Sequence, residues 1–366
     1  MTRRPKIAVV GCGYWGSKHV RVFRELSSAY LTLAVDDSQQ RLDYIRESYP
    51  DVATTQNYED ALNSDVDGIV LATPISSHYK LAREALLAGK HVLVEKPLAT
   101  TSQQCHELIA LAEARSLTLM VGHTFEYNPA VTYLRDLVLS GDLGDLYYID
   151  SARLNLGLFQ RDADVLWDLA PHDLSIIFYI LGLPALSISA RGSAHILQNR
   201  PDVAFADLTF HNGISAHLHV SWLDPCKVRR VTIVGSKKMV VFNDVAPSEK
   251  VRIYDKRFTM TTSGDQYSDW QAAYHNGNVV MPPISGVEPL RLECQDFIQS
   301  IATGSPVRAD GQHGLRVVEA LEAASQSLVN GGRVESLSAP APTLLLPTAP
   351  AVALENSYAL YQHSQQ

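Results

Sequence analysis

Short apolar runs alternate with amphipathic stretches through the first third of the chain. Each run is bounded by turn residues and predicts a buried strand, while the apolar spacing between runs predicts helices. The predicted strands are residues 6–10, 30–35, 68–72, 91–95 and 118–121, with a weak one near 52–54. The predicted helices are residues 14–27, 38–48, 76–88 and 101–115. This alternation favours an α/β domain with a doubly wound parallel sheet, which we expect over residues 1–124.

A helix is predicted at residues 129–139. After it the pattern changes, and residues 146–158 predict a strand. Pro171 suits the first position of a helix that continues to about Leu181, because its missing N–H would be unpaired there anyway. Further strands are predicted at 185–196, 202–210, 214–222, 228–235 and 238–243, a long loop at 257–285, and helices at 288–302 and 312–329. We expect a second α/β domain over residues 125–332 and an Ala/Pro-rich tail over 333–366.

The first predicted strand runs into the turn Gly11-x-Gly13-x-x-Gly16 at the start of the first helix. In such a turn Gly11 permits the tight bend, Gly13 lets the backbone approach a pyrophosphate, and Gly16 lets the helix pack closely on the sheet. The helix N-terminus offers N–H groups to phosphates, so Tyr14 and Trp15 are also cofactor-binding candidates. A turn without a ligand is the alternative, but strand, glycines and helix together favour a dinucleotide site.

The second predicted strand ends at Asp36, twenty residues after Gly16. A carboxylate at this position can accept hydrogen bonds from both ribose hydroxyls of the adenosine half, and it would repel a 2′-phosphate. We therefore predict that a Rossmann domain of this chain binds NAD rather than NADP.

Two later strand ends carry polar residues that should line the same crevice, since ligands bind beyond the carboxyl ends of parallel strands. For His78, a cofactor contact and a histidine satisfied within its own turn are equally good interpretations. Lys96 at the end of a buried strand suits proton transfer, because burial and nearby cations lower the pKa of a lysine. The candidates here are Thr73, Pro74, His78, Glu95, Lys96 and Pro97.

Composition narrows the class of function. The chain is 46% hydrophobic and 19% charged, and its net charge of −8 argues against a nucleic-acid partner. Its apolar stretches are too short for a membrane span or an export signal. The four cysteines form no C-x-x-C pair and suggest reduced thiols in a cytoplasmic protein. His217 and His219 share one strand face but lack a third ligand, so we predict no metal site.

Four motifs follow one another along the chain, namely Gly11-x-Gly13-x-x-Gly16, Thr73-Pro74 with His78, Glu95-Lys96-Pro97 and Asp168-x-x-x-His172. Together they resemble the glucose–fructose oxidoreductase / inositol dehydrogenase (Gfo/Idh/MocA) family over about residues 5–330. The resemblance implies an N-terminal Rossmann domain and a C-terminal α/β domain with a large, mostly antiparallel sheet, whose open face commonly forms a dimer or tetramer interface. The polar but uncharged face of residues 214–222 agrees with a homodimer or homotetramer.

Further segments look like the family branch that acts on nucleotide-activated amino sugars, namely residues 167–173, 221–225, 234–238 and 288–291. This resemblance implies an NAD-dependent dehydrogenase that oxidises the C3 hydroxyl of UDP-N-acetylglucosamine or its uronic acid. An inositol, polyol or free-sugar dehydrogenase is the alternative within the family. A non-catalytic, nucleotide-sensing partner protein is a weaker alternative, because such a protein could dispense with the lysine and the histidine that this chain retains.

The catalytic candidates are Lys96, His172 and Asp168. An unperturbed histidine titrates near pH 6.5, so His172 is a suitable base, with Asp168 expected to orient its ring. Lys96 would stabilise charge on the reacting hydroxyl or itself accept the proton, and the sequence leaves both roles open. Many family members carry a second acid where this chain has Ser175, and whether Asp173 compensates is also open.

Substrate contacts are predicted from position alone. Tyr127 and Asn128 follow the sixth strand and should face the cleft. Cationic side chains ahead of the Asp/His pair could meet a uronate or a diphosphate. The full set of substrate-binding candidates is Lys96, Tyr127, Asn128, Arg153, Asn155, Arg161 and His172.

Overall fold

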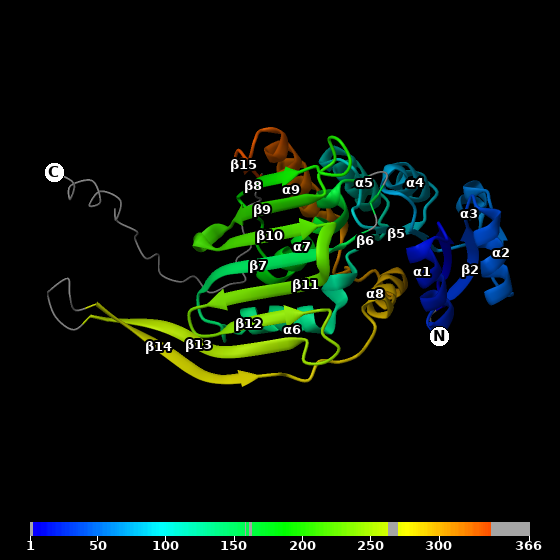
Figure 1. Cartoon of the computed structure of the whole chain (residues 1–366). Coiled ribbons are helices and arrows are strands. Elements are labelled where there is room, and N and C mark those ends of the chain that lie inside the picture. The colour runs from blue at the N-terminus through cyan, green and yellow to red at the C-terminus, as the bar shows by residue number, and fades with distance from the viewer. Residues whose placement is uncertain (1–2, 158, 161–162, 263–269, 338–366) are drawn as a thin grey trace.

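The computed structural model describes residues 3–157, 159, 160, 163–262 and 270–337. It contains two sheets that lie next to each other, each with helices packed on it (Figure 1). The α/β fold class predicted from the sequence is confirmed. Within the described residues, no helix is both long and apolar enough to cross a membrane.

The first sheet is parallel throughout and has the strand order β3-β2-β1-β4-β5-β6. The order reverses direction between β1 and β4, and this is where doubly wound sheets bind ligands. The predicted strands are confirmed to within a residue or two. Their bounds are β1 (Lys6–Val10), β2 (Tyr30–Val35), β3 (Ala53–Thr55), β4 (Gly68–Leu71), β5 (His91–Glu95) and β6 (Leu119–Gly122).

Helices cover both faces of this sheet, because successive side chains of each strand point to opposite sides and both sets are apolar. Ile7 and Val9 pack in one core cluster with α1 and α2, while Ala8 and Val10 pack in another with α4 and α5. A short helix, α3, was not predicted. The bounds are α1 (Tyr14–Glu25), α2 (Gln39–Ser48), α3 (Tyr58–Asn63), α4 (Ile75–Leu87) and α5 (Ser102–Ala114).

The second sheet has nine strands in the order β14-β13-β12-β11-β7-β10-β9-β8-β15, and among the described pairs only β7 and β10 run parallel. The predicted loop at 257–285 is wrong over most of its length, because β13 and β14 form a long antiparallel ribbon there. The strands are β7 (Leu146–Leu156), β8 (Ser187–Ser193), β9 (Val203–Thr209), β10 (Ser215–Ser221), β11 (Leu223–Gly235), β12 (Met239–Asn243), β13 (Val251–Thr262), β14 (Trp270–Val280) and β15 (Glu335–Ser336).

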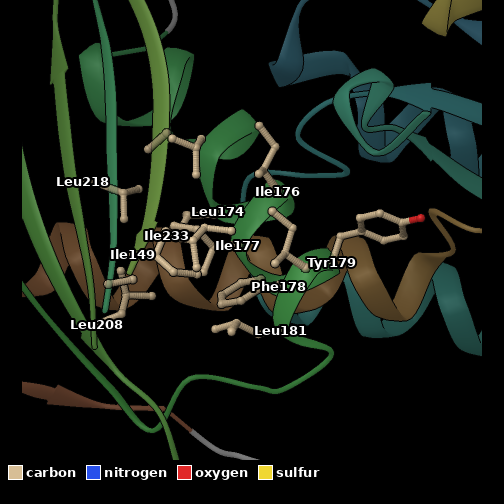
Figure 2. Packing of buried hydrophobic residues seen from close by; sticks show 14 of the residues in the cluster. Ile149, Leu174, Ile176, Ile177, Phe178, Tyr179, Leu181, Leu208, Leu218 and Ile233 are labelled. Atoms are coloured by element: carbon tan, nitrogen blue, oxygen red, sulfur yellow. The ribbon is translucent and has the colours of Figure 1, made fainter. Parts of the chain in front are cut away.

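Helix α7 (Val165–Leu181) lies against this sheet and builds the largest core cluster (Figure 2). Asp164 caps the helix by accepting the N–H of Trp167 at 3.0 Å. Pro171 therefore lies inside the helix and not at its first position, which corrects the prediction. The interior proline leaves the Trp167 carbonyl without its helical N–H partner. The packed side chains include Leu174, Ile177, Phe178 and Leu181 of α7 and Ile149, Leu208, Leu218 and Ile233 of the sheet.

The last two long helices return to the first sheet. Phe297 and Cys294 of α8 (Pro289–Thr303) lie in the cluster of α1 and α2, and Leu315 and Val318 of α9 (Gly311–Val329) lie in the cluster of α4 and α5. The chain therefore crosses between the two sheets three times. The remaining helical segments are α6 (Pro129–Leu139) and the short 3₁₀ turns η1 (Thr124–Tyr127) and η2 (His211–Gly213).

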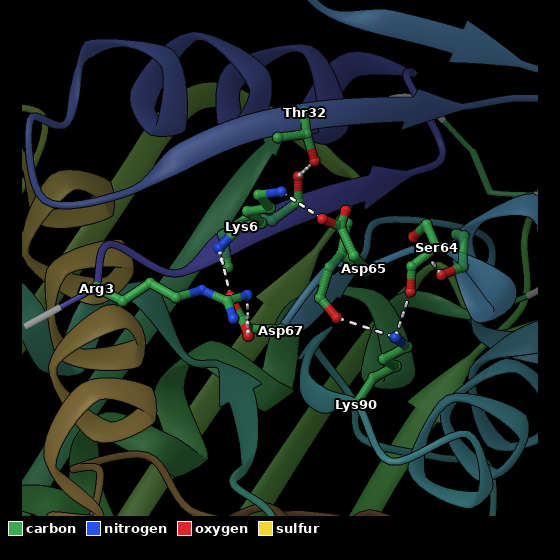
Figure 3. Close-up of polar contacts among 10 residues, drawn as sticks. Arg3, Lys6, Thr32, Ser64, Asp65, Asp67 and Lys90 are labelled. Atoms are coloured by element: carbon green, nitrogen blue, oxygen red, sulfur yellow. Dashed lines mark hydrogen bonds and ion pairs between the residues drawn. The ribbon is translucent and has the colours of Figure 1, made fainter.

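Polar contacts tie together the amino ends of the first sheet's strands (Figure 3). The Lys6 backbone N–H donates to Asp67 at 2.7 Å, Arg3 pairs with the same carboxylate at 3.0 Å, and Lys90 donates to the Ser64 carbonyl at 2.7 Å. These contacts lie at the edge opposite to the glycine-rich turn. The candidate site is therefore at the other end of the sheet, where the carboxyl ends of the strands meet.

Candidate functional site

The glycine-rich turn has no room for a side chain at its first and third glycines. Gly11 has a φ of +85°, and a Cβ on it would lie 2.6 Å from the Ala72 carbonyl oxygen. A Cβ on Gly16 would lie 1.6 Å from the Gly11 carbonyl oxygen. Above Gly13 the space is open, and the nearest atom to a Cβ there is Nη1 of Arg41 at 3.7 Å. Open space at the N-terminus of α1 fits a pyrophosphate against free backbone N–H groups.

Asp36 lies at the end of β2, directly beside this turn. Its carboxylate accepts the N–H of Cys12 at 2.6 Å and the N–H of Ser38 at 2.8 Å, and Arg41 lies 3.3 Å away. Burial raises the pKa of this carboxyl, but the two N–H donors and Arg41 outweigh burial and the net shift is downward. Asp36 is therefore an ionised acceptor beside the place where a ribose would lie.

His78 does not fit the role of a direct cofactor contact. Its ring is 1% exposed, and its two nitrogens lie 2.9 Å from the Pro97 carbonyl oxygen and 2.8 Å from the Thr73 carbonyl oxygen. One of these carbonyls belongs to another loop, so the histidine is not satisfied within its own turn, and the neutral ring has one N–H to donate to the two of them. His78 joins the loops after β4 and β5 and fixes their backbones relative to each other.

Glu95 is 8% exposed, and its Oε1 lies 2.9 Å from Nε2 of His19. His19 is fully buried on α1, and its other ring nitrogen faces Sγ of Cys294 at 3.7 Å. His19 was not predicted as a site residue from the sequence. Its position on the helix that follows the glycine-rich turn is the signal that could have identified it.

Lys96 connects the two halves of the site. Its ammonium donates to the backbone carbonyl of Asp168 at 2.8 Å and lies 3.7 Å from Oδ1 of the same residue. Burial lowers the pKa of Lys96, Asp168 and Glu95 oppose that shift, and the net direction is downward. Trp222 Nε1 donates to Asp168 Oδ2 at 3.1 Å. Asp168 is thus oriented by Trp222, a partner that the sequence analysis did not assign.

His172 lies one helical turn beyond Asp168, and its ring packs edge-on against Phe125 with 5.3 Å between the centroids. Its Nδ1 is buried without a hydrogen-bond partner among the described residues. The prediction that Asp168 orients this ring is therefore wrong, because the Asp168 carboxylate oxygens face Lys96 and Trp222. Burial, with Lys96, Arg153 and Arg229 nearby, holds the pKa of His172 well below 6.5. The ring is consequently neutral at neutral pH.

Two cavities meet at this point. One of about 460 Å³ is lined by residues from the first sheet and from α7, among them Thr73, Pro74, Lys96, Pro97 and Asp168. The other, of about 250 Å³, is lined by His172, Phe125, Asn128 and Arg229 among others. Trp15 and Glu95 line both cavities. The arrangement can hold a dinucleotide beside Lys96 and a second molecule between Lys96 and His172.

The prediction that Tyr127 faces the cleft is wrong. Tyr127 is 3% exposed and donates its hydroxyl to Asp296 of α8 at 2.6 Å, and it is not among the residues that line the His172 cavity. Its neighbour Asn128 caps α6 by accepting the N–H of Ala130 at 2.9 Å, and it also lines the His172 cavity.

The other predicted substrate contacts differ in their positions. Arg153 is 4% exposed and pairs with Asp173 at 2.6 Å, so its charge is already matched and Asp173 does not replace an acid beside His172. Asn155 is half-buried near the end of β7. Arg161 lies outside the described residues.

Both halves of the chain match domains of a known family. Residues 5–123 match an oxidoreductase family with an NAD-binding Rossmann fold, and residues 131–241 match the GFO/IDH/MocA C-terminal domain. A UDP-N-acetylglucosamine 3-dehydrogenase of Acidithiobacillus ferrooxidans is 29% identical over 331 residues, which is 86% of this chain and 94% of that protein. Inositol 2-dehydrogenase 2 of Saccharopolyspora erythraea is 27% identical over 58% of this chain and 66% of its own.

Solved structures share the fold. UDP-N-acetylglucosamine 3-dehydrogenase GnnA from Acidithiobacillus ferrooxidans superposes with a TM-score of 0.75 at 24% identity, covering 89% of this chain and 98% of its own. GenD2 from gentamicin A biosynthesis, solved in complex with NAD, superposes with a TM-score of 0.78 at 23% identity over 92% and 97%. With one family domain matched at each side of the cleft, the chain belongs to the GFO/IDH/MocA family of NAD-dependent oxidoreductases.

Proposed function

We propose that this oxidoreductase acts on a nucleotide-activated amino sugar, UDP-N-acetylglucosamine or its uronic acid, and that it oxidises the C3 hydroxyl of the ring. The observation that carries the proposal is that Lys96 and His172 line two adjoining cavities that share Trp15 and Glu95, in a chain that aligns over 94% of a UDP-N-acetylglucosamine 3-dehydrogenase. The cleft supplies a polarising cation and a neutral base, which are the groups that alcohol oxidation requires.

NAD⁺, when bound, accepts the hydride that leaves the ring carbon. The hydroxyl proton leaves in the same reaction, so the products are the keto sugar, NADH and one proton. His172 accepts that proton, since its lowered pKa keeps the ring neutral and able to receive it. Lys96 donates a hydrogen bond to the reacting oxygen and stabilises the negative charge that develops there. Trp222 and Asp168 hold the ammonium of Lys96 in position.

The open face of the second sheet supports assembly with further copies of the chain. The ring of Phe205, which is 41% exposed, stacks on His219 with 4.3 Å between centroids, and Tyr148 is exposed on the same face by the register of β7 with β10. An aromatic sheet face of this kind is typical of an interface core. A homodimer or homotetramer would cover it.

The test is NADH formation with purified protein, NAD⁺ and a panel of UDP-N-acetylglucosamine, its uronic acid, UDP-glucose and myo-inositol. We expect reduction of NAD⁺ with a UDP-amino sugar alone, and a product whose C3 carbon is a ketone by NMR. Turnover of myo-inositol with no response to any UDP-sugar would overturn the proposal and select the inositol or polyol alternative. Inositol dehydrogenases are among the relatives, so this alternative is part of the panel.

A further inference from the structure

The cavity beside His172 carries more positive charge than its lining residues suggest. Lys18 and Arg229 line it, together with the acids Glu95, Asp244 and Glu288. Two of the acids have a cation outside the lining. Lys250 lies 3.3 Å from Asp244, which Arg229 also contacts at 3.4 Å, and Arg21 pairs with Glu288. Arg229 therefore shares its carboxylate with a second cation, and Lys18 adds a further positive charge to the lining.

Lys18 has no carboxylate partner in the part of the chain that the structure describes. Its ammonium lies 4.0 Å from the ring centroid of Tyr14 and 4.6 Å from that of Trp15. Helix α1 places it one turn beyond the glycine-rich turn, on the side of the His172 cavity. The ammonium is held by two aromatic faces, which orient a cation without neutralising it.

The cations near this cavity lower the pKa of two titratable groups. Burial and the charges of Lys96, Arg153 and Arg229 lower the pKa of His172, which lines the cavity. The hydrogen bond and charge of Lys18, with Lys227 and Arg229 further off, lower the pKa of Tyr14 on the same helix as Lys18. Tyr14 is 74% exposed, so an aromatic face is available to a ligand beside these cations.

These cations are separate from the coenzyme side of the cleft. The cavity that contains Thr73, Pro74 and Pro97 has neither Lys18 nor Arg229 in its lining. An anion bound by the pair would therefore belong to the molecule whose reacting hydroxyl faces His172. Its distance from the ring would be short, because the cavity has a volume of only about 250 Å³.

We infer that Lys18 and Arg229 form the subsite for the diphosphate of the substrate, with the exposed ring of Tyr14 available to its nucleoside. This inference rests on the proposed function and names what distinguishes a nucleotide sugar from a free sugar at this site. Arg229 presents a planar fork that suits phosphate oxygens, and Lys18 supplies a point charge. The sugar then extends inward to His172 and Lys96.

The experiment compares Lys18→Met, Arg229→Gln and Arg229→Lys with the wild-type enzyme. The charge-matched control is Lys80→Met with Arg83→Gln, two exposed residues of α4 outside both cavities. Binding of UDP to the enzyme–NADH complex is measured by calorimetry, and KM and kcat are measured with the active UDP-sugar. We expect about a tenfold weaker UDP affinity and a similarly raised KM for each charge removal, with kcat within about twofold. Arg229→Lys should retain part of the affinity.

The outcomes separate this inference from the proposed function. Unchanged UDP affinity in both charge-removal variants would overturn the subsite, as would an equal loss of NADH affinity, which would assign the cations to the coenzyme. UDP binding that weakens in the variants, in an enzyme that oxidises no UDP-sugar, would uphold the subsite and refute the proposed function. A wild-type enzyme that oxidises myo-inositol and does not bind UDP would refute both.

Discussion

Lys96 and Asp168 meet across the two halves of the molecule, with the Lys96 ammonium 2.8 Å from the Asp168 backbone carbonyl oxygen. Lys96 directly follows β5 of the first sheet, and Asp168 lies in the first turn of α7, which packs on the second sheet. Both residues line the cavity that also contains Thr73, Pro74 and Pro97. The position of the ammonium therefore depends on both halves being correctly packed.

Replacing Lys96 with Met should lower kcat by about 10²- to 10⁴-fold, because the reacting oxygen loses its cationic hydrogen-bond donor. The affinity for NADH should stay within about threefold, since the phosphate site is built by the glycine-rich turn. Steady-state kinetics and NADH fluorescence titration measure the two effects. Lys80→Met, a change of the same kind on the exposed face of α4, serves as control. Near-normal turnover in Lys96→Met would remove Lys96 from the mechanism.

The pH profile should identify the proton acceptor. Protonated His172 cannot accept the substrate proton, and its pKa is held well below 6.5 by burial and nearby cations. Activity should therefore persist at pH 6.5 and fall only as the pH drops below that value. The acid limb of log kcat/KM, which reports the free enzyme, locates this group. The limb should disappear in His172→Ala, whose turnover is expected to be about 10²- to 10⁴-fold lower. An acid limb above pH 6.5 that survives in this variant would assign the base to Lys96.

Trp222 is expected to act as a positioning residue. Trp222→Phe removes the N–H that Trp222 donates to Asp168 at 3.1 Å while keeping an aromatic ring in the core. Without that donor the Asp168 carboxylate can turn, and Lys96 loses its 3.7 Å ion pair with Oδ1 while keeping its bond to the backbone carbonyl. We expect kcat to fall about tenfold with KM little changed, and a loss of stability of about 1 kcal/mol. A thermal melt separates the two effects, and a variant with normal kcat would show that Trp222 serves packing alone.

His123 should make the fold sensitive to acid. It is fully buried, neither ring nitrogen has a hydrogen-bond partner among the described residues, and burial with His313 and Lys96 nearby holds its pKa well below 6.5. In the unfolded chain the same ring binds a proton near pH 6.5. Stability contributed by the neutral ring is therefore present above pH 6.5 and lost as the pH falls below it.

His123→Leu should accordingly make the free energy of unfolding fall less steeply between pH 6.5 and 5, by up to about 1.4 kcal/mol per pH unit. The decline of Tm over this range should flatten with it. His106→Gln, which changes an exposed histidine of α5, should leave the slope as it is in the wild type. Equal slopes in the wild type and His123→Leu would show that His123 is protonated in the folded protein.

Local signals in the sequence predicted the first domain well. The turn from Gly11 to Gly16, Asp36 at the end of β2 and Lys96 at the end of β5 are set by strand period and turn chemistry, which act over a few residues. NAD as the cofactor and the α/β class followed from these signals. The β13–β14 ribbon was missed because its Thr-, Gly- and Ser-containing segment resembles a loop until its cross-strand partners are known.

Side-chain orientation depended on contacts between distant parts of the chain. Tyr127 turns away from the cleft because α8 returns to the first sheet and presents Asp296, 169 residues further along. His78 became a link between two loops, and Asp168 turned to Lys96 and Trp222 instead of His172.

The sequence by itself determined the dinucleotide turn, the alternation of strands and helices and the identity of the residues at the strand ends, because these depend on neighbouring residues. The tertiary structure alone decided which of those residues face one another. Hydrogen bonds and desolvation arise only when elements far apart in the chain pack together. The neutral state of His172 is such a case, since it results from burial on α7 and from cations of β5, β7 and β11.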